Sequence, residues 1–319
     1  MNIHIVHLPH TFPYLLEFSL AFKKYGFDTV TLVANGFNLE EIKQLKKSVS
    51  CFTFIEILDI PTKRILSHGQ ALNFAFEHSQ DELFCFADHD IFPTQNLRQD
   101  IQLSLQEYDV VCLGDRPENT QTVYKGFAAS ATESQSGVPL ATSFFSIFKR
   151  KVIEQAKLHF NVGFEQYFRK SQLPRSLTDQ SDIKSLQEPF LIDTCKVLSL
   201  AFYELGYNVK YLNTDKVCHY GGLAGAINRY INNNKSLKSE FIAPHLPGNQ
   251  ELENHYKTYQ KRHPKVLELK RCISDYALQL IIALQEETSL PSFKTDNDEL
   301  KKSVDKIKLA TQKLFISGF

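Results

Sequence analysis

The feature that most constrains the fold is a short apolar run, Leu83–Ala87, which ends abruptly at Asp88-His89-Asp90. Such a run between polar segments is typical of a strand buried on both faces of an α/β sheet. Ligands bind at the carboxyl ends of these strands, so Asp88 and Asp90 are placed for chemistry. Two carboxylates this close repel each other unless a cation lies between them, and Mn²⁺ or Mg²⁺ suits such hard oxygen ligands. Taken alone, the triplet is as typical of a polar turn.

Strand and helix patterns alternate along the N-terminal part of the chain. They predict strands at residues 3–7, 29–34 and 52–58, and helices at residues 14–25 and after the capping residue Asn38. This alternation predicts a doubly wound, Rossmann-like α/β sheet, which binds nucleotides at its carboxyl edge. No Gly-x-Gly-x-x-Gly follows the first strand, which argues against a dinucleotide cofactor. A nucleotide would instead be held by loop side chains.

The middle of the chain continues the same pattern. It predicts a helix at residues 95–107, strands at 109–113, 142–148 and 209–212, and a helix opened by Lys149-Arg150. Two polar segments, residues 114–141 and 169–189, show no clear periodicity. We expect the second to be a lid over the ligand or a linker without a core face.

A helix pattern precedes the acidic strand and contains Gly69-Gln70-Ala71-Leu72-Asn73, and Pro93 follows the Asp-x-Asp triplet three residues on. In order and spacing these residues resemble the GT-A-fold glycosyltransferases, particularly the family 2 type, and the likeness covers roughly residues 1–225. The resemblance implies a GT-A-like mixed sheet that binds a nucleotide-diphosphate sugar as donor, together with Mn²⁺ or Mg²⁺. It also implies that Gly69 and Asn73 belong to the donor site.

The resemblance further implies a set of metal ligands. Asp90 would bind the metal, and Asp88 would reach either the metal through water or the ribose of the donor. The resemblance implies that His219 completes the metal shell. His219 also follows a short apolar step and precedes two glycines that let the backbone approach closely, which favours a site residue. A structural histidine is the alternative for His219.

The loops after the first three predicted strands would hold the base and the ribose. Pro9 and Asp59 are the expected contacts in the first and third loops, although both residue types also suit ordinary turns. In the second loop the resembled family often carries an aspartate, and this chain has Asn35 instead. The resemblance therefore implies an amide contact to the donor at Asn35.

Asp193 precedes a helix pattern that stops at Gly206. An N-terminal helix cap is one interpretation of this carboxylate. In the resembled family an acid at the start of the corresponding helix faces the acceptor hydroxyl, which implies that Asp193 is the catalytic base. The usual second acid is absent, since Ile192 precedes Asp193.

The composition changes after Asn228, and an asparagine run at residues 232–234 and a turn at 244–248 predict a boundary. We expect a catalytic domain at residues 1–230 and a helical C-terminal extension at 231–319, with helices at 266–285 and 300–315. In the last helix lysines crowd around an apolar face, which consists of Leu300, Val304, Ile307 and Leu314. A solvated surface helix is the leading interpretation, and a helix on the membrane surface is the alternative.

Composition constrains the partners and the compartment. Lys+Arg and Asp+Glu balance at 36 each, so the net charge gives no argument for a nucleic-acid partner. The six cysteines contain no Cys-x-x-Cys pair, which is typical of the cytosol. The N-terminus lacks a basic leader, and no apolar stretch approaches the roughly 18 residues that cross a bilayer. We expect a cytoplasmic protein, with peripheral membrane contact through the last helix as the alternative.

The resemblance thus implies metal-dependent, inverting transfer of a sugar to a hydroxyl acceptor on a surface polysaccharide or lipid-linked glycan. A metal-dependent nucleotidyltransferase is the nearest alternative, but such enzymes usually carry a Gly-rich, basic loop where this chain has Leu8-Pro9-His10-Thr11. A phosphatase of the Asp-x-Asp type would have the triplet after its first strand. A non-catalytic sugar-binding partner subunit is the remaining alternative, and the presence of the metal-ligand set and of Asp193 argues against it.

Overall fold

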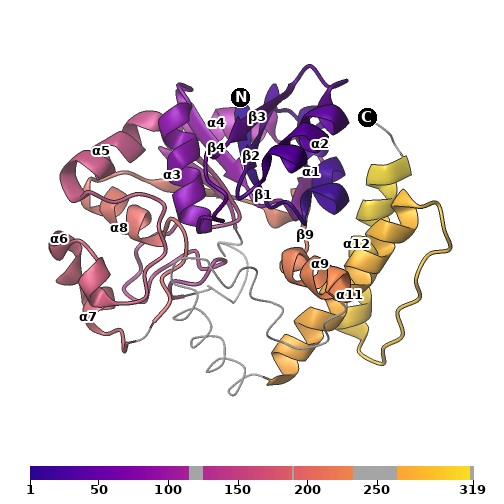
Figure 1. Cartoon of the computed structure of the whole chain (residues 1–319). Helices are drawn as coiled ribbons and strands as arrows, with labels where there is room; N and C mark the ends of the chain where they lie inside the picture. Colours follow the sequence, from indigo (N-terminus) through magenta and orange to yellow (C-terminus); the bar gives the residue numbers. More distant parts are fainter. Residues whose placement is uncertain (115–124, 189, 233–263, 317–319) are drawn as a thin grey trace.

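The computed structural model describes residues 1–114, 125–188, 190–232 and 264–316 (Figure 1). A seven-stranded sheet forms the centre, in the order β3-β2-β1-β4-β7-β6-β8. In that order the strands are Ile55–Asp59, Thr29–Ala34, Asn2–His7, Leu83–Ala87, Phe145–Lys149, Val110–Leu113 and Val209–Leu212. Strand β7 runs antiparallel to both of its neighbours, and the other pairs are parallel. The predicted mixed α/β sheet is confirmed.

Helices cover both faces of this sheet, as the alternating pattern predicted. One hydrophobic cluster contains residues of α3 (His68–His78), α5 (Arg150–Phe160) and α8 (Lys196–Glu204). A second cluster contains residues of α1 (Phe12–Lys24), α2 (Leu39–Val49) and α4 (Arg98–Glu107). Asn38 caps α2 as predicted, in a capping box with Glu41. Each large side chain buried in these layers contributes about 1.5–3 kcal/mol.

The acidic strand occupies the centre of the sheet. Strand β4 lies between β1 and β7, and its residues Phe84, Cys85, Phe86 and Ala87 have no exposed surface. This burial on both faces explains why the sequence of β4 is a continuous apolar run rather than an alternating one. Because the chain leaves the core after Ala87, Asp88 begins the loop at the carboxyl edge.

The prediction that residues 169–189 lack a core face is wrong. This segment forms η1 (Lys170–Gln172), α6 (Arg175–Thr178) and α7 (Ser181–Lys184). Leu173, Leu177 and Ile183 from it are buried in the cluster that also holds α3, α5 and α8. Helices of three or four residues are too short to show a helical repeat, so they leave no periodic pattern in the sequence.

The C-terminal part packs on the N-terminal part rather than standing apart from it. A two-stranded antiparallel ribbon joins β5 (Ile91–Pro93) to β9 (Val217–His219), which the short helix η2 (Thr214–Lys216) precedes. Three helices follow, α9 (Leu223–Ile231), α11 (Pro264–Gln285) and α12 (Asp298–Ile316). They share one hydrophobic cluster with α1 and with both strands of the ribbon. The predicted division after residue 230 stays a prediction, and the turn at residues 244–248 that marked it lies outside the described residues.

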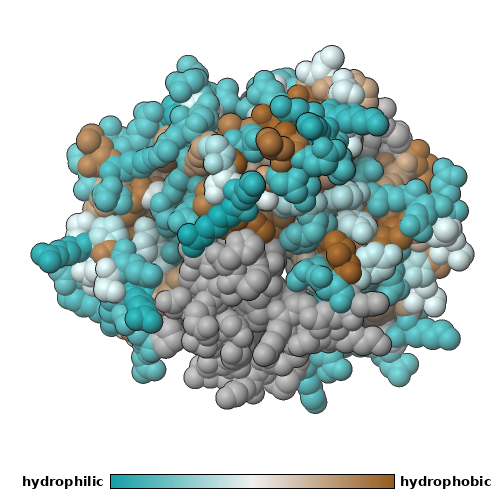
Figure 2. Space-filling view, viewed as in Figure 1, coloured by the Kyte–Doolittle hydropathy of each residue, from teal (hydrophilic) through white to brown (hydrophobic). Residues whose placement is uncertain are grey.

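The last helix uses its predicted apolar face inside the protein. Leu300, Val304 and Leu314 are buried, and Ile307 is partly buried against α1, α9 and α11. Hydrophobic and hydrophilic side chains alternate over the C-terminal helices on the visible face of the molecule (Figure 2). Among the described helices, none combines the length and the apolar character that a membrane span requires. Membrane contact would therefore have to use the outer side of α12, where Lys313 is exposed.

Candidate metal and donor site

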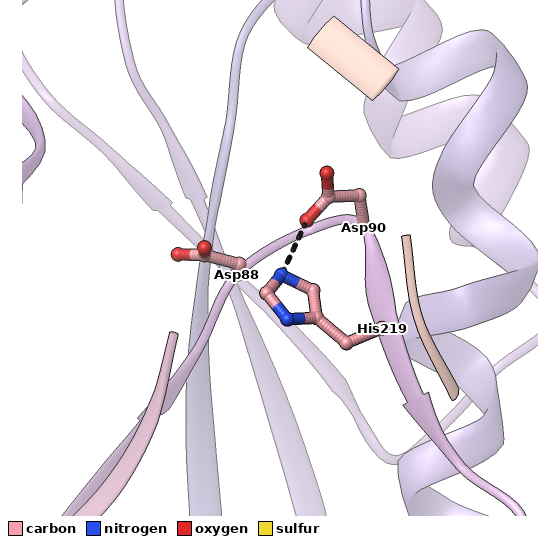
Figure 3. A group of neighbouring side chains, drawn as sticks. All are labelled: Asp88, Asp90 and His219. Atoms are coloured by element: carbon pink, nitrogen blue, oxygen red, sulfur yellow. Dashed lines mark ion pairs between the residues drawn. The ribbon is translucent and has the colours of Figure 1, made fainter. Parts of the chain in front are cut away.

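Asp88, Asp90 and His219 come together at the carboxyl edge of β4 (Figure 3). One possible ligand atom from each side chain lies within 4.8 Å of the others. The ribbon explains this approach, because its register places His219 opposite Ile91, the residue after Asp90. His219 Nε2 lies 3.6 Å from Asp90 Oδ1. The structure thus brings together the three residues that the sequence analysis grouped as metal ligands.

The backbone around these residues fixes their orientation. Asp88 N donates to Phe144 O at 2.8 Å, and Tyr220 N donates to Asp90 O at 3.1 Å. Leu223 N, at the start of α9, donates to Asp90 Oδ2 at 3.2 Å. The ring of His219 stacks on that of Phe144, with centroids 4.6 Å apart. Asp90 is therefore held by backbone donors from two sides, while its Oδ1 faces His219.

The charges of the cluster favour a bound cation. Burial and the neighbouring charge of Asp90 raise the pKa of Asp88 well above its usual range. Burial also opposes ionisation of Asp90, but the hydrogen bond and the charge of His219 outweigh it and hold the pKa of Asp90 well below its usual range. Asp90 in turn raises the pKa of His219 against the effect of burial. Two carboxylates and an imidazole suit a divalent ion such as Mn²⁺, which would relieve the repulsion between the carboxylates.

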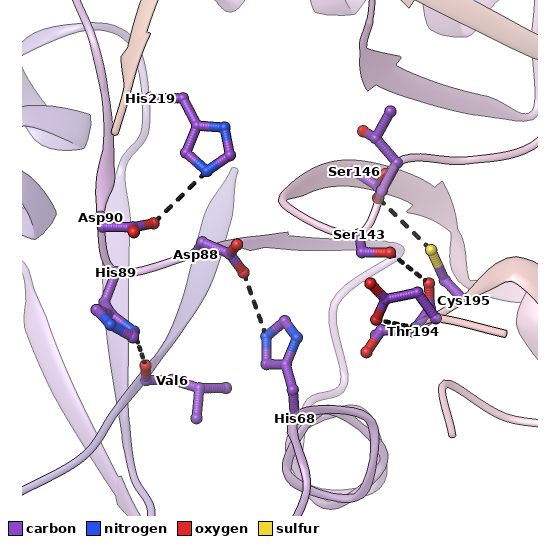
Figure 4. A network of polar contacts seen from close by, with 12 residues as sticks. Val6, His68, Asp88, His89, Asp90, Ser143, Ser146, Thr194, Cys195 and His219 are labelled. Carbon is purple, nitrogen blue, oxygen red and sulfur yellow. Dashed lines mark hydrogen bonds and ion pairs between the residues drawn. The ribbon is translucent and has the colours of Figure 1, made fainter. Parts of the chain in front are cut away.

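His68 is a residue of this site that the sequence analysis missed. It is the first residue of α3, and its Nε2 lies 3.6 Å from Asp88 Oδ1 (Figure 4). The capping box formed by Ser67 and Gln70 fixes this first turn of the helix. Desolvation lowers the pKa of His68 to about 4, so its ring is neutral at pH 7. The capping box is the one signal in the sequence that could have pointed to His68.

Three further imidazoles lie behind the acidic cluster. His89 points away from its two aspartate neighbours, and its Nδ1 lies 3.1 Å from Val6 O (Figure 4). Because a carbonyl can only accept, Nδ1 carries the proton and Nε2 of His89 is an acceptor. Among the described residues, Nε2 of His89, Nε2 of His10 and Nδ1 of His7 are buried without a hydrogen-bond partner. Burial lowers the pKa of His10 to about 4 and that of His7 to about 3.

The predicted donor residues occupy the same edge in different ways. Pro9 lies in the loop after β1, and Asp59 is the exposed last residue of β3. Asn35 is buried, and its amide holds the loop before α3, because Nδ2 donates to Leu66 O at 3.0 Å and Oδ1 accepts from Leu66 N at 2.9 Å. Contact of these residues with a donor stays a prediction.

Gly69 and Asn73 face a segment of the chain around Phe164. A Cβ added to Gly69 would lie 2.2 Å from Phe164 O, so only glycine allows α3 to approach this backbone so closely. Asn73 Oδ1 accepts from Phe164 N at 3.0 Å, and its Nδ2 donates to the carboxylate of Glu165. Both residues therefore join α3 to residues 163–165, and a donor contact at Gly69 or Asn73 stays a prediction.

Asp193 lies near enough to His68 and Asp88 for its charge to act on both. The N-cap of α8 is Cys195, so the helix-cap interpretation of Asp193 is wrong. Asp193 Oδ1 accepts hydrogen bonds from Gln166 Nε2 at 2.8 Å and from Thr194 N at 2.7 Å. Its charge counteracts the lowering of the pKa of His68 and adds to the raised pKa of Asp88. The predicted base and the predicted metal ligands thus share one electrostatic environment.

No protein-family model matches the sequence, and no curated protein matches it either. Among solved structures, glycosyltransferases are similar to this chain. The mannosyltransferase PcManGT from Pyrobaculum calidifontis, in complex with GDP-Man and Mn²⁺, is 11% identical, with a TM-score of 0.44 over 100% of this chain and 87% of its own. TarS 1-349 of S. aureus is also 11% identical, with a TM-score of 0.43 over 100% of this chain and 92% of its own.

A protein from Bacillus anthracis described as a glucose-1-phosphate thymidylyltransferase is similar as well. It is 11% identical, with a TM-score of 0.40 over 67% of this chain and 86% of its own. Sugar transfer and nucleotide transfer thus both occur among the similar structures. Similarity at this level does not distinguish sugar transfer from nucleotide transfer. The residues of the site must therefore distinguish the two activities.

Proposed function

We propose that this protein is a metal-dependent glycosyltransferase that moves a sugar from a nucleotide-diphosphate sugar to a hydroxyl acceptor on a surface polysaccharide or lipid-linked glycan. The observation that carries the proposal is the Asp88, Asp90 and His219 cluster at the carboxyl edge of the central strand. The charge of Asp193 acts on Asp88 of that cluster. Asp193 as the base and the cluster as the site for the diphosphate would then serve the same reaction.

Asp90 and His219 would hold Mn²⁺ or Mg²⁺, and Asp88 would contact the ion through water or the ribose of the donor. When bound, the ion would neutralise the negative charge that develops on the leaving diphosphate. The neutral ring of His68 beside Asp88 would face the donor without adding charge to the site.

Asp193 would act as the general base. Its Oδ1 is occupied by two hydrogen bonds, and among the described residues Oδ2 has no hydrogen-bond partner. Oδ2 could therefore take the proton of the acceptor hydroxyl as that oxygen attacks the anomeric carbon. Attack from the face opposite the leaving diphosphate is a single displacement, which inverts the anomeric centre.

The loop after β1 supports sugar transfer over nucleotidyl transfer. Several of its backbone donors are used within the loop, since Thr11 N and Phe12 N both donate to Leu8 O, and Leu8 N donates to Thr11 Oγ1. A phosphate-binding loop needs free backbone N–H groups, and usually glycines and a lysine, to hold the triphosphate. The loop after β1 has neither glycine nor lysine, and most of its backbone N–H groups are already used, which disfavours the nucleotidyltransferase alternative.

Release of free nucleotide from a panel of nucleotide sugars in the presence of Mn²⁺ tests the proposal. We expect one donor to be turned over by the wild type. In Asp90→Asn both the turnover and the metal dependence of donor binding should be lost, although the side chain keeps its size and its acceptor for Leu223 N. Asp179→Asn is the matched control, because Asp179 is an exposed carboxylate on the distant α6–α7 segment.

The metal assignment would be contradicted if the wild type turned over a donor and donor binding depended equally on metal in Asp90→Asn and Asp179→Asn. Donor binding without any turnover would instead favour the non-catalytic partner subunit. Transfer of a nucleotidyl group from a nucleoside triphosphate to a sugar phosphate would favour the nucleotidyltransferase.

A further inference from the structure

Gln166 and Asp193 lie opposite each other across a short antiparallel contact. Tyr167 N donates to Ile192 O at 3.0 Å, and Ile192 N donates to Tyr167 O at 2.9 Å. In antiparallel pairing the residue before one partner faces the residue after the other. Gln166 therefore faces Asp193, and side chains of directly opposed residues can contact each other.

This contact holds Oδ1 of the Asp193 carboxylate and does not engage Oδ2. Gln166 Nε2 and Thr194 N both donate to Asp193 Oδ1, at 2.8 and 2.7 Å. Two donors on one oxygen hold the plane of the carboxylate, because rotation about the Cβ–Cγ bond would break both bonds. Within the described chain, Oδ2 is left without a hydrogen-bond partner.

The segment that carries Gln166 is itself anchored to α3. Phe164 N donates to Asn73 Oδ1 at 3.0 Å, and the absence of a side chain at Gly69 lets α3 touch Phe164 O. The first residue of α3 is His68, which lies beside Asp88. One helix thus sets the position of His68 near the metal ligands and, through residues 164–166, that of Asp193.

We propose that Gln166 is a positioning residue that holds Asp193 with Oδ2 turned toward the acceptor hydroxyl. This inference rests on the proposed function, because it assigns Asp193 the role of base. A misplacement of about 1 Å at a reacting group can lower a rate by about 10²-fold. Loss of the Gln166 bond leaves Thr194 N in place, so we expect kcat to fall by roughly 10- to 100-fold.

Two variants test the role of the Gln166 amide in the full-length protein. Gln166→Met keeps the length of the side chain and removes the donor, and Gln166→Glu keeps the shape but cannot donate in its ionised form. The matched control is Gln180→Met, because Gln180 Nε2 makes a 2.7 Å bond to the carboxylate of Glu204 at the other end of α8. Nucleotide release from the donor found in the panel gives kcat and the KM for the donor.

We expect kcat to fall in both Gln166 variants while the KM for the donor stays within about twofold. Gln180→Met should match the wild type. Sodium azide separates positioning from a general structural effect, because azide attacks the anomeric carbon without losing a proton. A carbon–nitrogen bond forms as the bond from the anomeric carbon to the diphosphate breaks, so no base is required. Nucleotide release with azide should therefore be equal in the wild type, Gln166→Met and Asp193→Asn.

Each other outcome overturns the inference. An unchanged kcat in both Gln166 variants would show that Thr194 N is sufficient, while wild-type turnover would leave the proposed function standing. A lower kcat that azide does not restore, or a raised KM for the donor, would mean that Gln166 only supports the fold. Absence of nucleotide release from the wild type with every donor would remove the proposed function and the role of Gln166 together.

Discussion

Replacing Gly69 by alanine tests the close packing of α3 on the segment around Phe164. The added Cβ would lie 2.2 Å from Phe164 O, 2.6 Å from Phe164 C and 2.7 Å from Glu165 Cα. All three atoms are backbone atoms, so no side chain can rotate away. Ordinary contact begins near 3.4 Å, which means that α3 and the segment must separate by about 1 Å.

The magnitude follows from three effects. Overpacking against backbone costs up to about 3 kcal/mol. The separation also stretches the bond from Phe164 N to Asn73 Oδ1, which adds about 1 kcal/mol. Alanine is a better helix former than glycine by up to about 1 kcal/mol, and this gain opposes the other two. We therefore expect the free energy of unfolding to fall by about 2–4 kcal/mol.

Urea denaturation of the wild type, Gly69→Ala and Gly206→Ala measures the effect. Gly206 is the matched control, because a Cβ there meets no atom within 4 Å and only the positive φ of 77° is unfavourable. We expect Gly206→Ala to lose about 1 kcal/mol and to keep its turnover. Gly69→Ala should lose both stability and turnover, since Phe164 leads into Gln166. An unfolding free energy within about 0.5 kcal/mol of the wild type would refute the packing argument.

Three further outcomes are expected. Asp193→Asn should keep metal and donor binding by calorimetry and lose turnover by roughly 10²-fold or more, and proton NMR of the wild-type product should show an inverted anomeric centre. Burial lowers the pKa of His7 from 6.5 to about 3, so its contribution to stability is complete above pH 6.5 and is lost as the pH falls toward 3. Between pH 7 and 5 this group alone removes about 2 kcal/mol, and urea denaturation of His7→Gln should show a correspondingly weaker pH dependence. We also expect weak, salt-sensitive co-sedimentation with anionic liposomes, reduced in Lys306→Glu/Lys313→Glu and unchanged in Lys43→Glu; equal binding of all three proteins would mean that α12 makes no membrane contact.

Local sequence patterns were sufficient to predict the elements whose residues are determined by their neighbours along the chain. Strand β4 could be predicted because a strand buried on both faces must be apolar throughout, and strand β2 because its apolar run ends at a turn. The cap of α2 was readable because Asn38 and Glu41 have the spacing that a capping box requires. Asp88 and Asp90 followed from their position directly after β4.

Contacts between distant residues could not be read from the sequence. His68 reaches Asp88 only because α3 begins at the same edge as the end of β4, and that depends on the order of the strands. Gln166 faces Asp193 through a pairing of two irregular segments that carry no alternating pattern. The resemblance to a known family supplied His219 and Asp193, since neither residue lies in a pattern that requires it.

The C-terminal helices support the cluster of Asp88, Asp90 and His219 directly. His219 reaches Asp90 because β9 pairs with β5, and this ribbon has no other strand beside it in the described sheet order. An isolated two-stranded ribbon is marginal in water, so it needs packing on at least one face. That packing comes from Phe92 and Tyr220, which contact the ring of Phe18 on α1, and from buried residues of α9, α11 and α12 in the same cluster. The N-terminus of α9 also donates Leu223 N to Asp90 Oδ2. Helices α9, α11 and α12 are therefore part of what holds the carboxylate and the imidazole together at the edge of the sheet.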